Sequence, residues 1–250
     1  MQTQTLTYEA DGLHMVSHLY YEEQRDGRQP GVLVFPEAFG LGDHANSRAE
    51  RLAGLGYVAL ACDLHGDGRM VHDLNAALEL VGPLRAEPAR ARARATAALQ
   101  ALQGRPEVDA TKIAAIGYCY GGSMALELAR GGASLAGVVG FHSGLATAAP
   151  QDAKNIKGKV LVCIGADDPS IPPDQRSAFE QEMREGRVDW QMNLYGGVVH
   201  SFTNPEADQR GQPERARYDA KADARSWAEM CAFFEEIFRL PIDARATPMA

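Results

Sequence analysis

Cys119 lies in a sequence pattern suited to nucleophilic catalysis. It is the central residue of the motif GYCYG at 117–121, directly after the apolar run 112–116 and before a segment with helical periodicity. In a strand–turn–helix setting, such a G-x-nucleophile-x-G motif forms a sharp turn that projects the nucleophile above the strand end. Unpaired N–H groups at the start of a helix favour a thiolate. We therefore predict that Cys119 is a nucleophile.

A nucleophile needs a base, and the base needs a group that orients it. His200 is the candidate base, because it lies in a loop after the predicted strand 189–195 and before the last helical segment. The candidate acids are Asp167 and Asp168, which follow the apolar run 159–164. Their order along the chain is cysteine, aspartate, histidine, and both aspartates remain candidates for the acid.

The other histidines and cysteines have no such position, and we interpret them as surface or core residues. No CxxC pair occurs, which argues against a zinc site and against a disulfide framework. These structural residues are His14, His18, His44, His65, His72, His142, Cys62, Cys163 and Cys231.

The elements that position the candidate residues alternate along the chain. Short apolar runs bounded by Gly, Pro or Asp predict buried parallel strands, and the helical patterns between them predict right-handed crossovers. Two weakly alternating segments, 3–8 and 13–21, predict an antiparallel hairpin at the sheet edge. The pattern indicates an α/β fold with a mostly parallel, doubly wound sheet flanked by helices. The remaining predicted strands are 31–35, 57–62, 112–116, 135–141, 159–164 and 189–195, and the predicted helices are 46–55, 71–80, a segment reaching 102, 121–130, 172–184 and 219–239.

Length and charge limit the class of protein. The 250 residues suit one domain, 1–250, with a loose tail after residue 240, and 45% of them are hydrophobic. Twenty-five basic and 33 acidic residues give a net charge of −8, which disfavours nucleic acid and anionic membranes as partners. The polar start resembles no secretory signal, and no apolar run is long enough to span a membrane. We expect a cytoplasmic protein with a small-molecule partner, and its oligomeric state stays open.

Four separated motifs give nearly the whole chain a resemblance to the dienelactone hydrolase family of the α/β-hydrolase superfamily. GYCYGG at 117–122 is similar to the family's cysteine elbow, and FPEAFG at 35–40 is similar to its early glutamate motif. Residues 195–202 resemble the histidine loop that ends in H-x-F. GADDPSIP at 165–172 resembles the family's G-x-x-D-x-x-V/I-P motif, and its phase selects Asp168. The resemblance implies a single α/β-hydrolase domain without a cofactor or a metal.

The resemblance also assigns roles in the early glutamate motif. It implies that Glu37 contacts the thiol of Cys119 in the resting enzyme and controls its ionisation. A nearby anion disfavours the thiolate, so Glu37 would protect Cys119 from oxidation until substrate displaces the carboxylate. The backbone N–H groups of Ala38 and Tyr120 would form the oxyanion hole.

The chain departs from the family where substrate binds. Asn204 stands where the resemblance expects an arginine that holds a substrate carboxylate, and we assign Phe39 and Asn204 to the substrate pocket. The arginines of 85–94 offer another anion anchor, but a solvated helix face explains them more simply. The Gly-rich segment 63–69 is expected at the pocket rim as a turn, not as a metal site. We therefore expect an uncharged pocket that prefers neutral esters, with an extension to neutral phosphate triesters.

These expectations combine into a cofactor-independent hydrolase of activated esters or lactones. His200, oriented by Asp168, assists attack by Cys119, and water releases the acyl-enzyme. A non-catalytic ligand-binding protein on the same scaffold is one alternative. A redox sensor that uses the Cys119 thiol is another, although no resolving cysteine lies nearby in the sequence.

Overall fold

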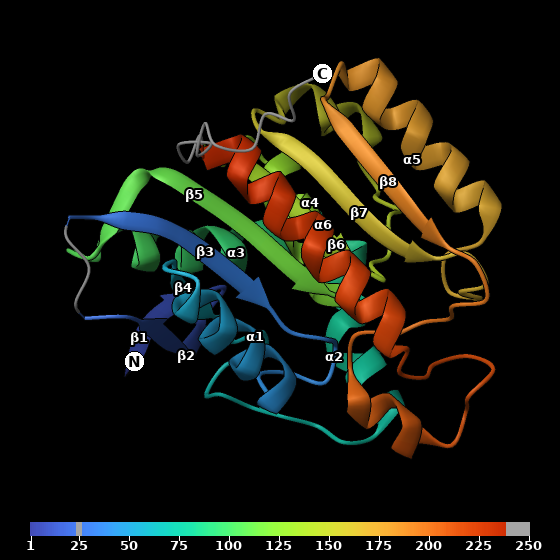
Figure 1. Ribbon diagram of the computed structural model, residues 1–250, viewed down its shortest axis with the longest axis horizontal. Helices are drawn as coiled ribbons and strands as arrows, with labels where there is room; N and C mark the ends of the chain where they lie inside the picture. Colours follow the sequence, from blue (N-terminus) through green and yellow to red (C-terminus); the bar gives the residue numbers. More distant parts are fainter. Residues whose placement is uncertain (24–26, 239–250) are drawn as a thin grey trace, which may run out of the picture.

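An eight-stranded sheet forms the centre of the computed structural model, which describes residues 1–23 and 27–238 (Figure 1). The strand order is β1-β2-β4-β3-β5-β6-β7-β8; β1, β2 and β4 pair antiparallel, and every pairing from β4 to β8 is parallel. This arrangement confirms the mostly parallel α/β sheet and its antiparallel edge hairpin. The strands are β1 (Gln2–Ala10), β2 (Leu13–Tyr21), β3 (Gln29–Phe35), β4 (Val58–Ala61), β5 (Val108–Tyr118), β6 (Gly137–Phe141), β7 (Lys159–Gly165) and β8 (Trp190–Tyr195).

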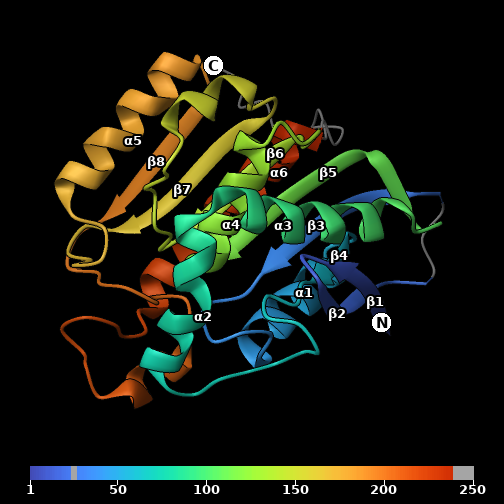
Figure 2. The ribbon, with the colours of Figure 1, turned by 180° about the vertical axis from the view of Figure 1, so that it is seen from behind.

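Helices cover both faces of the sheet, as the two opposite views show (Figures 1 and 2). One apolar core layer joins the sheet to α1 and α6, and the other joins it to α2, α3, α4 and α5. The helices are α1 (Asp43–Gly54), α2 (Leu74–Ala86), α3 (Pro88–Gln103), α4 (Tyr120–Arg130), α5 (Pro173–Gly186) and α6 (Ala220–Phe238), with 3₁₀ turns η1 (Pro150–Asn155) and η2 (Pro205–Arg210).

Several helices and strands begin at other residues than predicted. Helix α2 begins three residues later than expected, because Asp73 caps it by accepting a hydrogen bond from the Ala76 N–H at 2.9 Å. Strand β5 begins four residues earlier than expected, because the buried Val108 and the polar Asp109 already pair with the start of β3. The predicted tail after residue 240 lies outside the described residues. Within the described chain, no helix has both the length and the apolar character to cross a membrane.

The carboxyl ends of the parallel strands meet at one edge of the sheet, where α2 and the loops after β3, β5, β6, β7 and β8 gather (Figure 2). A cleft of about 1260 Å³ opens there, and its lining includes Glu37, Cys119 and His200. Open α/β sheets bind ligands at this edge. The fold therefore brings the sequence-predicted residues from separate loops into one cleft.

Candidate active site

Cys119 sits in a tight turn between β5 and α4. Its backbone has φ +54° and ψ −121°, a conformation that non-glycine residues rarely adopt. A Cβ atom on Gly117 would lie 2.1 Å from the carbonyl oxygen of Gly121, and one on Gly121 would lie 2.3 Å from a β3 carbonyl oxygen. Neither position accepts a side chain. The glycines flanking Cys119 are therefore required by close backbone approach, as the motif indicated.

His200 lies between Asp168 and Cys119. Its Nδ1–H donates to Oδ2 of Asp168 at 2.6 Å, and the other oxygen of Asp168 accepts the Ser170 N–H at 2.8 Å. Burial lowers the pKa of His200, but the charge of Cys119 and hydrogen bonds with Asp168 and Cys119 outweigh it and hold the pKa well above its ordinary value. Asp167 is exposed and lies off this chain of contacts. The hydrogen bond to His200 therefore distinguishes Asp168 from Asp167.

The amides of Ala38 and Tyr120 border the cleft. Within the described residues, neither N–H donates to a protein acceptor, and the Tyr120 N–H belongs to the first turn of α4. The Ala38 carbonyl accepts a hydrogen bond from Nε2 of His65 at 2.8 Å, which fixes this loop. Two free N–H groups beside a thiol suit an oxyanion that forms in the transition state.

Glu37 is buried and has three hydrogen-bond donors. Oε1 accepts from the Ser201 hydroxyl at 2.6 Å, while Oε2 accepts from Nδ2 of Asn204 at 2.7 Å and from Nη2 of Arg210 at 2.6 Å. Burial raises the pKa of Glu37, but Arg210 and two nearby histidines overcome it and lower the pKa far below its ordinary value. The expected contact with Cys119 is not among the hydrogen bonds of the described residues. In this structure, the carboxylate is held by Arg210 instead.

Phe39 and Asn204 both line the cleft, as expected. The guanidinium of Arg210 lies 4.7 Å from the centre of the Phe39 ring. Asn204 is only 3% exposed, and besides binding Glu37 it caps η2 by accepting the Glu206 N–H at 3.0 Å. The Asn204 amide therefore serves the protein more than a ligand.

The cleft is charged, which corrects the expectation of an uncharged pocket. Arg85, Arg210 and Arg215 all line it. Arg85 was weighed in the sequence as an anion anchor and set aside as part of a solvated helix face, whereas Arg210 and Arg215 were not considered. Arg85 lies over the ring of Tyr120, with its guanidinium carbon 5.3 Å from the ring centre.

The other arginines of 85–94 are not a solvated face. Arg90 and Arg94 both bind Asp11 of the edge hairpin, at 2.9 and 2.8 Å. Arg92 turns toward α4 and binds Glu127. The solvated interpretation was wrong for these residues, because their acidic partners lie far away in the sequence.

The Gly-rich segment 63–69 is a turn, as expected. The Asp63 carboxylate accepts four backbone N–H groups, three from within this turn and one from Val16 of β2. The predicted place at the cleft rim was wrong by a few residues, since the following residues 70–74 line the cleft.

His142 is a site residue that the sequence argument treated as structural. The Cys119 N–H donates to its Nδ1 at 3.1 Å, so Nε2 carries the proton and donates to Oγ1 of Thr203 at 2.8 Å. Its ring meets that of His200 edge-on at 5.2 Å. Burial, and then the charge of His200, hold the pKa of His142 well below its ordinary value. The signal that could have found it is its position directly after β6, beside the β5 turn.

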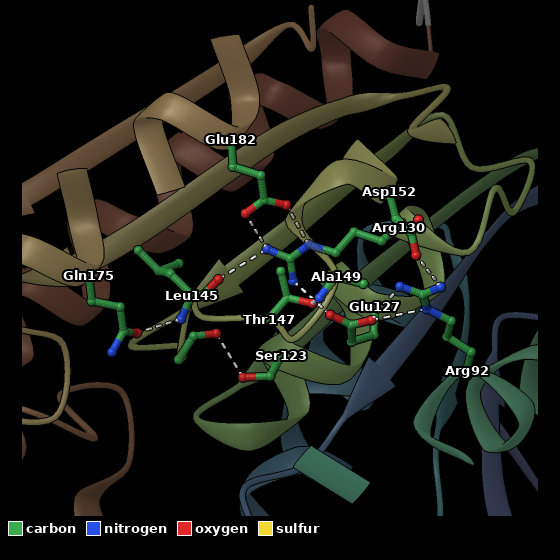
Figure 3. Close-up of polar contacts among 11 residues, drawn as sticks. Arg92, Ser123, Glu127, Arg130, Leu145, Thr147, Ala149, Asp152, Gln175 and Glu182 are labelled. Carbon is green, nitrogen blue, oxygen red and sulfur yellow. Dashed lines mark hydrogen bonds and ion pairs between the residues drawn. The ribbon is translucent and has the colours of Figure 1, made fainter. Parts of the chain in front are cut away.

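The β6–η1 loop, residues 142–149, forms one wall of the cleft and is fixed by hydrogen bonds (Figure 3). The Ser123 hydroxyl donates to the Gly144 carbonyl at 2.7 Å, and the Leu145 N–H donates to Oε1 of Gln175 at 2.8 Å. Nη2 of Arg130 donates to the Leu145 carbonyl at 3.0 Å. Contacts from α4 and α5 thus hold both sides of the loop.

Arg130 belongs to a buried charge cluster, which consists of Arg92, Glu127, Arg130, Asp152 and Glu182 (Figure 3). Arg130 is fully buried and donates to both oxygens of Glu182, at 2.7 and 2.8 Å, and to Glu127 at 3.0 Å. Arg92 joins Glu127 to Asp152, at 3.0 and 2.7 Å. Burial raises the pKa of Glu182 although Arg130 opposes the shift. The cluster therefore ties α3, α4, α5 and η1 together behind the cleft wall.

The chain is similar to several known proteins over most of its length. A protein of Synechocystis that carries the provisional name carboxymethylenebutenolidase is 28% identical over 232 residues, covering 84% of this chain and 87% of the relative. Two solved structures cover 94% of this chain and 98% of their own. One, called m3DLH, is 49% identical with a TM-score of 0.91. The other, P91 from metagenomic libraries, is described as a dienelactone hydrolase-like promiscuous phosphotriesterase and is 45% identical with a TM-score of 0.89.

A family model agrees with these relatives. The model of the dienelactone hydrolase family matches residues 17–238, a span that contains the Cys119 turn, the Asp168 loop and the His200 loop. Because this match covers most of the chain, the protein belongs to the dienelactone hydrolase family.

Proposed function

We propose that this lactone and ester hydrolase works through a thiol triad of Cys119, His200 and Asp168. The observation that carries the proposal is the placement of His200 in the cleft, hydrogen bonded to Asp168 on one side and facing Cys119 on the other. This placement supports the proposal, because covalent catalysis requires a nucleophile, a base beside it and an acid that orients the base. A purely ligand-binding protein has no need for this alignment.

The proposed reaction has two stages. The Cys119 thiol gives its proton to Nε2 of His200, and the thiolate attacks the substrate carbonyl. The amides of Ala38 and Tyr120 stabilise the resulting oxyanion. Collapse of this tetrahedral intermediate expels the alkoxide, which takes the proton from His200. A thioester on Cys119 remains. Water then gives a proton to His200 and attacks the thioester carbonyl. The C–S bond breaks, the carboxylic acid leaves, and the thiolate of Cys119 takes the proton back from His200.

The environment of Glu37 bears on thiol ionisation. A carboxylate beside Cys119 would disfavour the thiolate, so its position controls the nucleophile. Arg210, Asn204 and Ser201 hold Glu37 by three hydrogen bonds. We infer that Arg210 keeps the resting enzyme ready for attack and that breaking this ion pair would return Glu37 to the suppressing role.

The proposed substrates are small activated esters and lactones. Asn204 still leaves the family position without an arginine, yet Arg85 gives the cleft a second place to bind a carboxylate. The discriminating experiment compares kcat/KM for a neutral aryl ester and a carboxylate-bearing dienelactone in the parent and in Arg85→Gln. Selective loss of the dienelactone would assign the anchor to Arg85. A parent that prefers the neutral ester, with no change in the variant, would support the neutral-ester prediction.

Neutral phosphate triesters are a second proposed substrate class. The similarity to P91, described as a promiscuous phosphotriesterase, supports this extension, as does the polarisable thiol. Attack by Cys119 on phosphorus would expel an aryloxide and leave a phosphorylated thiol, which water must cleave. Release of nitrophenol from a dialkyl nitrophenyl phosphate over many turnovers would support the activity. A single burst without turnover would refute it.

Substitution of Cys119 by alanine tests the main proposal. We expect ester turnover to vanish while circular dichroism and the thermal midpoint stay near those of the parent, because this sulfur is only partly buried. Mass spectrometry of the parent during turnover should find an acyl adduct on Cys119. Full activity in a folded Cys119→Ala protein would refute the nucleophile. Oxidation by peroxide without any acyl adduct would favour the redox-sensor alternative.

We also propose a cytoplasmic location. The four cysteines are all unpaired, which suits a reducing compartment.

A further inference from the structure

Three large apolar side chains near the start of α2 are unusually exposed. Met70, Leu74 and Leu78 are 40%, 46% and 42% exposed, and they recur at intervals of four residues. Met70 precedes the helix, whereas Leu74 and Leu78 lie one turn apart on α2 and share a face. Ala77, Val81 and Leu84, which are buried in the core, lie on the adjacent side of the same helix. The apolar surface of α2 therefore continues from the core to side chains that are partly open to water. We call Met70, Leu74 and Leu78 the α2 apolar face.

The α2 apolar face lies in the same cleft as the nucleophile. All three side chains line the cleft together with Cys119 and Tyr120. Other exposed leucines of the described chain are elsewhere: Leu55 follows α1 and Leu194 lies on β8, and neither lines this cleft. The exposure at α2 is thus specific to the part of the surface where substrate would lie.

Backbone pairing joins the α2 apolar face to the candidate oxyanion loop. The N–H of Val71 donates to the carbonyl of Phe39 at 2.9 Å, and Met70 forms an isolated antiparallel bridge with Gly40. Phe39 directly follows Ala38, whose amide is a proposed oxyanion donor. A substrate whose carbonyl oxygen sits at Ala38 therefore shares the cleft with the α2 apolar face, which begins at Met70, paired with the residue two places after Ala38.

We propose that the α2 apolar face binds an apolar acyl or alcohol group of the substrate, so that the enzyme prefers esters with several methylenes or an apolar ring over acetate-sized esters. This proposal rests on the ester-hydrolase function above and adds its substrate class. Removing apolar surface from water is the driving force. Each methylene that becomes fully buried is expected to raise kcat/KM about fourfold, and partial burial on an open face about twofold.

The experiment measures kcat/KM along two series. The first varies the acyl chain of nitrophenyl esters from acetate to octanoate, and the second varies the alcohol of acetate esters. We expect kcat/KM of the parent to rise with chain length in at least one series. In Leu74→Gln/Leu78→Gln, that rise should flatten while the acetate ester is hydrolysed within about twofold of the parent rate. Glutamine has nearly the helix propensity of leucine, so the helix should persist.

Leu55→Gln is the matched control, because it makes the same change at an equally exposed leucine away from the cleft. It should leave the chain-length dependence unaltered. The proposal is overturned if neither series rises with length in the parent, or if the control flattens the rise as much as the α2 variant. It is also overturned if the α2 variant changes only the molecular mass in solution, which would make this face an interface between copies.

A binding measurement separates this inference from the proposed function. Calorimetric titration of Cys119→Ala with nitrophenyl acetate and with the octanoate ester should give tighter binding of the longer ester, and the α2 variant on the same background should lose that difference. If the parent hydrolyses no ester but this difference exists, the function fails and the binding face stands. If acetate is hydrolysed but no difference exists, the binding face fails alone.

Discussion

Arg210→Gln should show what the buried carboxylate of Glu37 needs. The substitution removes the guanidinium that binds Glu37 and keeps a polar side chain at the end of η2. Among the described residues, Ser201 and Asn204, both neutral, then remain as hydrogen-bond donors to Glu37. An ionised carboxylate that is 5% exposed loses its counter-charge, and we expect both the stability of the fold and the reactivity of Cys119 to fall.

The size of the expected stability loss in Arg210→Gln follows from how deeply the Glu37–Arg210 ion pair is buried. Removing one partner of a buried ion pair costs about 3–5 kcal/mol. The Arg210 side chain is 26% exposed, so water already screens part of the interaction, and about 2 kcal/mol is the reasonable figure. For a chain of this size that corresponds to about 4–8 °C in thermal midpoint. Glu37→Gln leaves a guanidinium that can turn to water, and it should cost about half as much.

The stability that Glu37 contributes depends on pH in a definite direction. In the parent, the pKa of Glu37 is lowered from its ordinary value of 4.5, so its stabilisation is present above that value and is lost as pH falls through the native pKa. Without Arg210, burial raises the pKa of Glu37, and protonation then relieves the unpaired charge. The difference in unfolding free energy between the parent and Arg210→Gln should therefore be largest near neutral pH and should shrink as the pH approaches 4.

Urea unfolding of the parent, both single variants and the double variant gives the coupling energy between Glu37 and Arg210. We expect the double variant to be more stable than Arg210→Gln alone, and Cys119 in Arg210→Gln to be alkylated more slowly than in the parent at pH 7. Arg215→Gln, at another cleft arginine, should match the parent in stability. Additive effects of the two substitutions, with an unchanged alkylation rate, would refute the reasoning about Glu37.

Three further predictions concern the triad and the turn. Asp168→Asn should lower kcat by about 10³-fold or more, whereas Asp167→Asn should change it little, and equal losses would require another acid. His142→Leu should lower kcat about three- to tenfold with KM unchanged, because the Cys119 N–H is shared between His142 and the Phe141 carbonyl and keeps only the carbonyl in the variant. His142→Asn keeps a carbonyl oxygen and tolerates the φ of +40°, so failure of asparagine to restore kcat would count against this positioning role. Gly121→Ala should destabilise the fold by about 3 kcal/mol in urea unfolding, since its Cβ would meet a β3 carbonyl oxygen at 2.3 Å, and a variant as stable as the parent would refute the required close approach.

Local sequence patterns were sufficient to predict the sheet and the turn at Cys119. The central strands are short apolar runs because parallel strands are buried on both faces, and the turn needs glycines within two residues of Cys119. The phase of the 165–172 motif also identified Asp168, which the structure places on His200. These features depend on residues close together in the chain.

Features that depend on distant pairing were not predictable in this way. Arg210 is 173 residues from Glu37, and nothing in either local segment indicates that they meet. His142 becomes a neighbour of Cys119 only because β5 and β6 pair in a particular register. The basic segment 85–94 looked solvated because Asp11, the partner of Arg90 and Arg94, lies 79 and 83 residues away in the edge hairpin.

The buried charge cluster behind the β6–η1 loop has an evolutionary consequence. Loss of Arg130 or of Glu182 leaves an opposite charge stranded away from water, so single substitutions at this pair face a large penalty that a second, compensating substitution removes. The exposed leucines of α2 face no such penalty, because no protein group depends on them. Descendants of this chain should therefore keep the wall formed by Arg130 and Glu182 while α2 drifts, and new substrate preferences should arise first on the α2 side of the cleft.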